Sequence, residues 1–306
     1  MFRNCQILLP TDFSGNADYA FPYAVAFAKT FGGRIHLAHV VDEGAASGGA
    51  APAYGLASGD LGPLLDAMEE HAQARLEHIR SQLNEQGVEV VVHLVRGNPV
   101  EALAQLAEDH GCTLIAIASH GRRGFDHLVF GSVAERVLRT SPVPVLFVKH
   151  PEHEFVRATE GTIAIDRVLY PTDYSEFCEK GLPFANSVCR EFGASLTLVH
   201  GFEYPMNSPE LIPEASTNVT LSLESSARQM LKDWQAEVKD VPVDSEMRVG
   251  SPYRVVRELA KKLEIDLIVV PTHGRSGVAH MFLGSVAERI ARHAPCPVLT
   301  IRPSLP

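Results

Sequence analysis

The chain contains two stretches of sequence that are near copies of each other. Residues 120–136 read HGRRG, six further residues and GSVAER, and residues 273–289 read HGRSG, six further residues and GSVAER, so that Gly121 and Gly274 lie 153 positions apart. An earlier pair, PTDFS at 10–14 and PTDYS at 171–175, lies 161 positions apart. One unit of about 150 residues therefore occurs twice. We expect two similar domains, at residues 1–150 and 165–306, joined by a linker at residues 151–164.

Short apolar runs alternate with longer helical patterns in both copies, which is typical of a doubly wound α/β domain. Runs such as LIAIA at 114–118 are apolar throughout, which indicates strands buried on both faces. Apolar residues from Leu65 to Leu83 recur at helical spacing before Gly87, and Asn98-Pro99 predicts the start of another helix. Each copy is thus predicted to form a five-stranded parallel sheet, with strands at 6–10, 34–41, 88–95, 113–118 and 143–149 and at 167–171, 195–202, 243–249, 266–271 and 297–302.

Charge and cysteine usage exclude several classes of partner and compartment. A net charge of −10 argues against a nucleic-acid partner, because no basic surface is available to neutralise phosphates. The five cysteines are odd in number and lack a metal-like spacing, which favours buried thiols in a reducing compartment. The first residues lack a signal-peptide pattern, and no apolar run approaches the ~20 residues of a membrane span. We expect a cytoplasmic protein without a membrane partner.

The first copy is longer than the second by about eight residues between its second strand and its second helix. The extra residues fall in the Gly/Ala/Ser-rich segment 44–62. This segment is either a mobile loop at the mouth of a site or a passive insertion.

Gly131-Ser132 and Gly284-Ser285 each precede a helical pattern, where backbone N–H groups and the positive end of the helix dipole suit a phosphate. A structural alternative needs no ligand, because SVAE at 132–135 and at 285–288 fits a capping box. Capping does not explain the glycines or the length of the preceding loop, which favours phosphate binding. Both roles can coexist.

Asp12 and Asp173 follow the first strand of each copy, where a parallel sheet places its ligands. A carboxylate there can accept hydrogen bonds from ribose hydroxyls or hold Mg²⁺. An Asx turn or a helix N-cap explains the same residue equally well. Arg122, Arg123 and Arg275 could reach a phosphate, although arginines in loops are usually solvated.

Motifs of several nucleotide-binding and hydrolytic folds are missing from the sequence. There is no G-x-x-x-x-G-K-[ST] segment, and no G-x-G-x-x-G segment follows the first strand, which argues against a P-loop NTPase and a dinucleotide-binding fold. A G-x-S-x-G nucleophile elbow is also missing.

The combination of PTDFS after the first strand, SHG at 119–121, Gly131-Ser132 nine residues later and PVPVL at 142–146 resembles the universal stress protein family, as a tandem member. The resemblance covers nearly the whole chain. It implies a sheet in the order 3-2-1-4-5 in each domain and, in one subgroup, an ATP site on a Gly-x2-Gly-x9-Gly-Ser/Thr loop. Carried over by position, ATP would meet Asp12, the main chain of Val40, Ala118, Gly121, Gly131, Ser132 and Val133 in the first copy, and Asp173, Gly201, Gly274, Gly284, Ser285 and Val286 in the second.

Both copies depart from the ATP-binding loop at its first glycine, which is Ala118 in one and Pro271 in the other. Alanine keeps the backbone N–H, whereas proline removes it. The first site is therefore expected to bind more tightly, and the non-binding branch of the family is the alternative for the second.

The resemblance favours an ATP-binding stress-response regulator that acts through a protein partner which the sequence does not identify. The alternatives are a nucleotide-independent interaction scaffold and a slow ATPase, for which His120 or Asp12 would have to serve as the base. We expect the two domains to pair as an intramolecular pseudo-dimer through their last strands, because edges this apolar invite aggregation. A homodimer is a further expectation.

Overall fold

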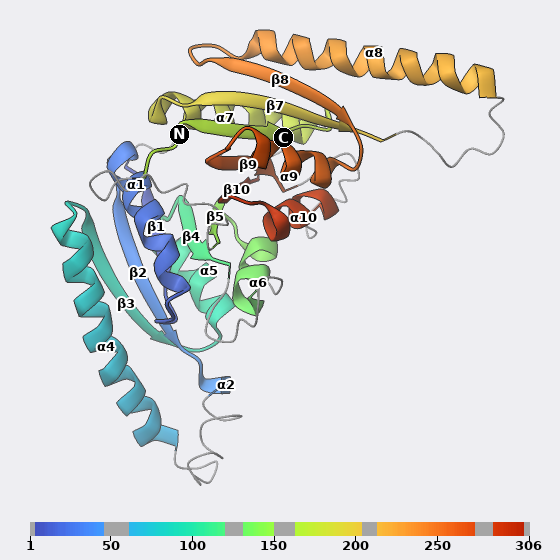
Figure 1. Cartoon of the computed structure of the whole chain (residues 1–306). Helices are drawn as coiled ribbons and strands as arrows, with labels where there is room; N and C mark the ends of the chain where they lie inside the picture. The colour runs from blue at the N-terminus through green and yellow to red at the C-terminus, as the bar shows by residue number, and fades with distance from the viewer. Residues whose placement is uncertain are drawn as a thin grey trace. The chain divides into compact units, whose positions relative to one another are not determined.

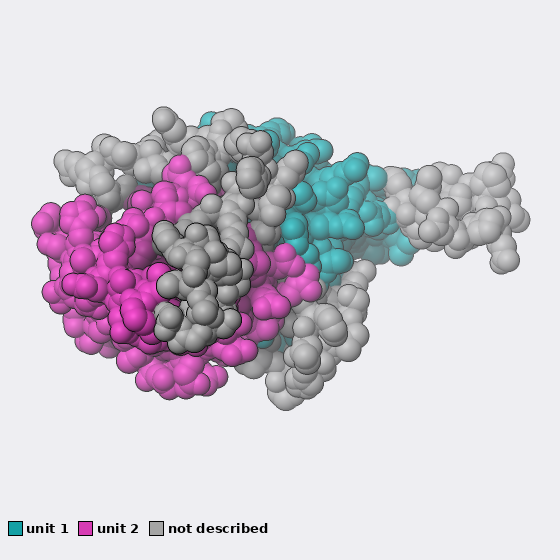
Figure 2. Space-filling model, turned by 90° about the horizontal axis from the view of Figure 1, so that it is seen from below, with its two compact units in different colours: residues 1, 151–156, 164–306 teal, residues 2–150, 157–163 magenta. Residues whose placement is uncertain are grey.

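The computed structural model describes residues 4–45, 61–119, 131–149, 163–203, 213–272 and 284–302. The chain divides into two compact units, one containing residues 2–150 and the other residues 164–306 (Figure 2). We call them the N-terminal unit and the C-terminal unit and describe each by itself.

The N-terminal unit is built on a parallel sheet in the order β3-β2-β1-β4-β5. The expected strand order is confirmed. The elements are β1 (Gln6–Pro10), η1 (Ala17–Ala20), α1 (Phe21–Phe31), β2 (Arg34–Val41), α2 (Glu43–Ala45), α4 (Leu61–Glu85), β3 (Glu89–Arg96), α5 (Pro99–Asp109), β4 (Leu114–Ala118), α6 (Ser132–Thr140) and β5 (Val145–Val148).

The C-terminal unit repeats this topology, with the order β8-β7-β6-β9-β10 and parallel pairing throughout. Its elements are β6 (Arg167–Pro171), α7 (Glu176–Phe192), β7 (Ser195–Phe202), α8 (Pro213–Glu237), β8 (Val243–Val249), α9 (Pro252–Lys262), β9 (Leu267–Pro271), α10 (Ser285–His293) and β10 (Val298–Ile301).

Helices cover both faces of each sheet. In the N-terminal unit α1 packs on β1 and β2 and α4 on β2 and β3, while α5 and α6 contact each other (Figure 1). In the C-terminal unit α8 lies along β7 and β8, and α9 and α10 contact each other. Because both faces are covered, central strand residues such as Leu8, Leu37 and Ile115 are buried. Burying each such side chain stabilises the unit by about 1.5–3 kcal/mol.

The helix signals read from the sequence are confirmed in detail. Leu65, Leu76 and Leu83 lie on the buried face of α4, and Gly87 follows the helix with a φ of 80°. Asn98 caps α5, since its Oδ1 accepts hydrogen bonds from the N–H groups of Val100 at 3.0 Å and Glu101 at 3.4 Å.

The last strand of each copy is shorter than predicted. β5 begins at Val145 and β10 at Val298, directly after Pro144 and Pro297, which have no N–H to donate to a ladder. In the first copy Val143 is held in the preceding turn, because its N–H donates to Ser141 Oγ at 3.2 Å and its carbonyl accepts from that hydroxyl at 2.7 Å.

Part of the segment that the sequence assigned to a loop is helical: α2 covers Glu43–Ala45 and α4 begins at Leu61. Residues 46–60 and most of the predicted linker lie outside the described residues. Among the helices described, none combines the length and the apolar character needed to span a membrane.

Candidate functional site

The turn after β1 holds Asp12 in a defined conformation. Asp12 Oδ1 accepts hydrogen bonds from Ser14 N–H at 3.0 Å and Ser14 Oγ at 2.6 Å, while Thr11 Oγ1 accepts one from Phe13 N–H at 3.0 Å. An Asx turn thus overlaps a threonine turn. Phe13 has a φ of 62°, in the left-handed region that residues other than glycine seldom adopt. The Asx-turn interpretation of Asp12 is correct, and the unusual backbone marks this turn as a functional candidate.

The turn after β6 has the same construction. Asp173 Oδ1 accepts from Ser175 N–H at 2.9 Å, and Thr172 Oγ1 accepts from Tyr174 N–H at 3.0 Å. Tyr174 has a φ of 61°, matching Phe13. The same short sequence, TD(F/Y)S, thus adopts the same strained turn in both units.

A histidine at the end of the second strand supports each turn. His39 Nδ1 lies 2.7 Å from the Thr11 carbonyl, and His200 Nδ1 lies 2.8 Å from the Thr172 carbonyl. Because a carbonyl oxygen only accepts, the histidine Nδ1 carries the proton in both cases. His39 also stacks on Phe13, with ring centroids 4.2 Å apart. The sequence analysis missed these histidines, although they share the 161-residue offset of the duplicated turns.

β1 and β4 part at their carboxyl ends, and we call the place beyond their last paired residues the crevice. The register between these strands covers only Ile7 with Leu114 and Leu8 with Ile115, and β4 continues for three residues beyond it to Ala118. β1 and β4 lead to helices on opposite faces, so this is the switch point at which open α/β sheets place ligands. Ser119 N–H donates to Val148 on β5 at 2.8 Å, so by strand alternation the Ala118 N–H faces β1 and the crevice.

The loop between Ser119 and Gly131 is closed at its base, because Gly131 N–H donates to the Ser119 carbonyl at 2.8 Å. The first hydrogen bond within α6 runs from Glu135 N–H to the Gly131 carbonyl at 2.9 Å. The N–H groups of Ser132, Val133 and Ala134 precede it, at the positions that have no acceptor within a helix. These three N–H groups lie at the helix start where the sequence analysis expects a phosphate.

The capping-box interpretation of Ser132 is wrong. Gly131 is the N-cap of α6 and makes no side-chain cap, which places Ser132 inside the first turn. The Glu135 carboxylate instead accepts from Arg139 one turn further on, at 3.2 Å. α10 has the same arrangement, with Gly284 as N-cap and Glu288 paired with Arg292. Helix capping, the explanation that needs no ligand, therefore does not account for these serines.

The C-terminal unit differs at the positions nearest the crevice. β9 ends at Pro271, which has no N–H where Ala118 has one. Gly284 N–H still closes the loop, by donating to the Thr272 carbonyl at 2.7 Å, and Ser285 and Val286 begin α10 with their side chains exposed.

Val40 and Gly201 occupy matching places on β2 and β7, paired with Val95 and Arg248. Val40 is half-buried. A Cβ at Gly201 would lie 2.6 Å from Pro252 Cα, so glycine is required there by close packing against α9. Gly121 and Gly274 lie outside the described residues, as do His120 and the three loop arginines.

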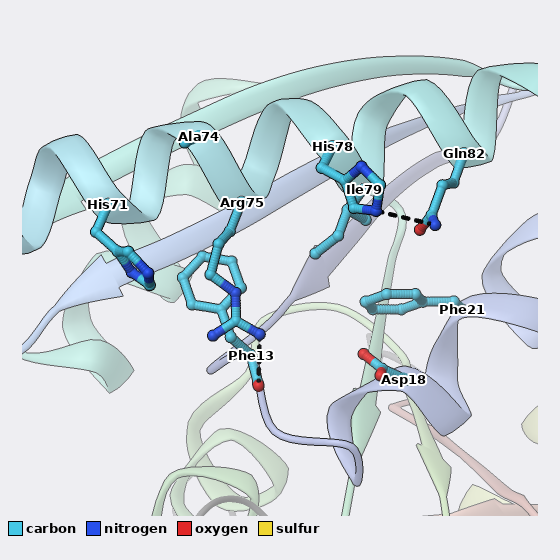
Figure 3. Close-up of a pocket in the computed structure, with 9 residues that line it drawn as sticks. All are labelled: Phe13, Asp18, Phe21, His71, Ala74, Arg75, His78, Ile79 and Gln82. Atoms are coloured by element: carbon cyan, nitrogen blue, oxygen red, sulfur yellow. Dashed lines mark hydrogen bonds between the residues drawn. The ribbon is translucent and has the colours of Figure 1, made fainter.

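A pocket of about 570 Å³ lies beside the Asp12 turn, on the face of the sheet that carries α1 and α4 (Figure 3). The Arg75 guanidinium lies over the Phe13 ring, 4.5 Å from its centroid, and donates to the Phe13 carbonyl at 3.1 Å. Partial burial raises the pKa of the Asp18 carboxyl, and Arg75 opposes that rise. The other lining residues are Phe21, His71, Ala74, His78, Ile79 and Gln82.

Two matching positions in the C-terminal unit carry larger side chains, Trp234 for Ile79 and Tyr174 for Phe13. The spacing of buried positions in α4, at Ala72, Leu76 and Ile79, recurs in α8 at Ala227, Leu231 and Trp234. Trp234 meets the Tyr174 ring edge-on at 5.7 Å, and Tyr174 Oη donates to the Ala227 carbonyl at 2.7 Å. The sequence analysis missed the pocket, because it depends on which side chains face each other across two elements.

Comparison with known proteins identifies the family. The model of the universal stress protein family matches the chain twice, at residues 4–149 and 164–302. The chain belongs to the universal stress protein family. Universal stress protein MJ0577 of Methanocaldococcus jannaschii is 32% identical over 154 residues, which cover 47% of this chain and 94% of that protein. A universal stress protein of Mycolicibacterium smegmatis is 24% identical over 306 residues, and the match covers 97% of each chain.

The fold of a tandem universal stress protein is also found among solved structures. The crystal structure of a universal stress protein from Archaeoglobus fulgidus covers 99% of this chain with a TM-score of 0.71 and 24% sequence identity. The tandem arrangement inferred from the repeat is confirmed by the two family matches.

Proposed function

We propose that the N-terminal unit binds an adenine nucleotide, ATP, at the carboxyl edge of its sheet, and that the bound state of this universal stress protein regulates its association with a protein partner. The observation that carries the proposal is the start of α6. A glycine N-cap without a side-chain cap leaves the N–H groups of Ser132, Val133 and Ala134 facing outward at the positive end of a helix.

The remaining parts of the site suit the other parts of a nucleotide. The Asp12 carboxylate is held at the crevice between β1 and β4, where it would accept from ribose hydroxyls or hold Mg²⁺ beside the phosphates. The main chain of Val40, at the end of β2, would contact the adenine. The Ala118 N–H adds a donor on the crevice side of β4.

The C-terminal unit offers a weaker form of the same site. Asp173, Gly284, Ser285 and Val286 repeat the carboxylate and the helix start. Pro271 removes one donor, and the packing of Gly201 against Pro252 brings α9 close to the end of β7. We therefore propose that the two units bind nucleotide unequally.

Mass spectrometry of the small molecules released from freshly purified, denatured protein tests whether a nucleotide is bound. Release of ATP in up to molar proportion to the chain is the expected result. If no nucleotide is released and none binds to the purified chain, the protein is a nucleotide-independent scaffold.

Matched variants then locate the site. Gly131 has a φ of −63° and a ψ of 136°, and Gly284 has −59° and 137°, so leucine fits the backbone at both positions. We expect Gly131→Leu to abolish most ATP binding by calorimetry, because its side chain blocks the start of α6. Gly284→Leu is the matched control and should reduce binding much less. Equal losses in the two variants would contradict the ranking of the sites.

A further inference from the structure

Three histidines from distant parts of the sequence meet in the N-terminal unit. His36 lies on β2, His93 on β3 and His110 directly after α5, and one ring nitrogen from each lies within 4.8 Å of the others. His36 is buried, His93 is half-buried and His110 is exposed. Two rings of the cluster therefore lie inside the unit and one lies at the surface.

Strand register brings the first two histidines together. His36 pairs with Val91, and His93 lies two residues further along β3, on the same face of the sheet. α5 packs on β1 and β2, and its last turn brings His110 to this pair. α5 runs back from the carboxyl ends of the strands, so the cluster lies toward their amino ends, away from the proposed nucleotide site.

We propose that His36, His93 and His110 form a binding site for a divalent transition-metal ion of the Zn²⁺ class. Imidazole nitrogen is a preferred ligand of Zn²⁺, Cu²⁺ and Ni²⁺, and three histidines with an open fourth position make a known type of zinc site. Tetrahedral zinc with Zn–N bonds of about 2.0–2.1 Å separates its ligand nitrogens by about 3.3 Å. His36 Nδ1 and His93 Nε2 lie 2.9 Å apart and all three ligand nitrogens lie within 4.8 Å, so the rings would have to rotate to reach that geometry, which the exposed His110 is free to do.

A neighbouring amide orients the buried ligand. His36 Nε2 lies 3.0 Å from Gln6 Oε1, and because that oxygen only accepts, Nε2 carries the proton. His36 Nδ1 is then the unprotonated nitrogen, and it accepts a hydrogen bond from His93 Nε2 at 2.9 Å. The proton on His93 Nε2 has to move to the other ring nitrogen, or be released, before that nitrogen can bind a metal. Metal-binding histidines are commonly held in this way, by a second residue that bonds the nitrogen which does not bind the metal.

The C-terminal unit shows that the fold does not require these histidines. The matching positions are Thr197 on β7, Glu246 on β8 and Leu263 after α9. Threonine and leucine at two of them support the same strands and helix without a histidine. The cluster is thus a feature of one unit, as a site for a specific ion would be.

The test is calorimetric titration of the full chain, first freed of metal with a chelator, with Zn²⁺. His110→Ala is the decisive variant, because His110 is exposed and its removal leaves the core unchanged. We expect the wild-type chain to bind one Zn²⁺ that His110→Ala binds at least tenfold more weakly. His71→Ala removes another exposed histidine, on α4, and should bind as the wild type does.

Two further measurements separate a built site from scattered surface histidines. Gln6→Leu should weaken Zn²⁺ binding by about ten- to a hundredfold, although Gln6 would not touch the metal. Co²⁺ in place of Zn²⁺ should give the visible absorption of a four-coordinate ion with the wild type and not with His110→Ala. No Zn²⁺ binding by the wild type, or equal affinity in the wild type and His110→Ala, would overturn the proposal. Neither result depends on nucleotide binding.

Discussion

The Ala118→Pro variant tests whether a single backbone donor ranks the two nucleotide sites. The structure indicates that proline fits at this position. Ser119, rather than Ala118, donates to β5, and the register of β4 with β1 ends at Ile115, before Ala118 is reached. Ile117 is extended, as a residue before proline must be. Pro271 ends the equivalent strand β9 in the C-terminal unit.

The expected loss follows from the one hydrogen bond that is removed. A hydrogen bond to a charged group contributes about 1.5–3 kcal/mol, which corresponds to about a ten- to a hundredfold change in affinity. We expect Ala118→Pro to weaken ATP binding at the tighter site by that factor. The reciprocal change, Pro271→Ala, restores a donor and should strengthen the weaker site by a similar factor.

Calorimetry of ATP binding to the full chain, at one fixed ionic strength, measures both changes. The melting temperature without nucleotide is the control for folding, and it should stay within a few degrees of the wild type. A correctly folded Ala118→Pro chain with unchanged ATP affinity would refute the reasoning, because the N–H facing the crevice would then contribute nothing to binding.

Three further predictions concern stability and reactivity. His39→Ala removes the hydrogen bond to the Thr11 carbonyl at 2.7 Å and should lower the free energy of unfolding by about 1–2 kcal/mol in urea denaturation, together with ATP affinity; unchanged values of both would contradict a supporting role for the ring. Gly33→Ala would place a Cβ 2.0 Å from the Cys5 carbonyl oxygen and should destabilise the chain by several kcal/mol, whereas Gly15→Ala, with nothing within 4 Å, should not. Burial raises the pKa of Cys5 and Cys112 to about 11, so these thiols are protonated at pH 8 and should react with a maleimide only after unfolding; fast labelling of the native chain, located by peptide mass analysis, would show that they are accessible.

The sequence predicted the fold well because the signals for it are local. Strands such as β2 and β7 are short, mainly apolar segments that begin at a polar residue, and their predicted bounds match the structure. The start of α5 at Asn98-Pro99 follows from two adjacent residues. The order of the strands required the resemblance to a family, because apolar runs alone do not specify which strands are neighbours.

The site was less accessible to sequence reasoning, for two different reasons. The capping-box alternative placed the N-cap of α6 at Ser132, one residue after the observed Gly131, whose N–H donates to the Ser119 carbonyl across a loop. The histidine cluster could not be found from spacing, since His36, His93 and His110 come from three elements and follow no motif. The register of β2 with β3 brings His36 and His93 together, and the packing of α5 on the sheet adds His110.

The duplication makes each unit a control for the other. Both units retain a strained left-handed residue, which lies between Asp12 and Ser14 in one and is Tyr174 in the other. This residue is required either by the turn itself or by what the turn binds. A feature that only one unit has is not required by the fold, and the Ala118 N–H and the three histidines belong to the N-terminal unit. The C-terminal unit has Pro271 in place of Ala118, and Thr197, Glu246 and Leu263 in place of the histidines. Ligand-binding differences between the units should therefore follow these substitutions, and exchanging them one at a time separates function from folding within a single chain.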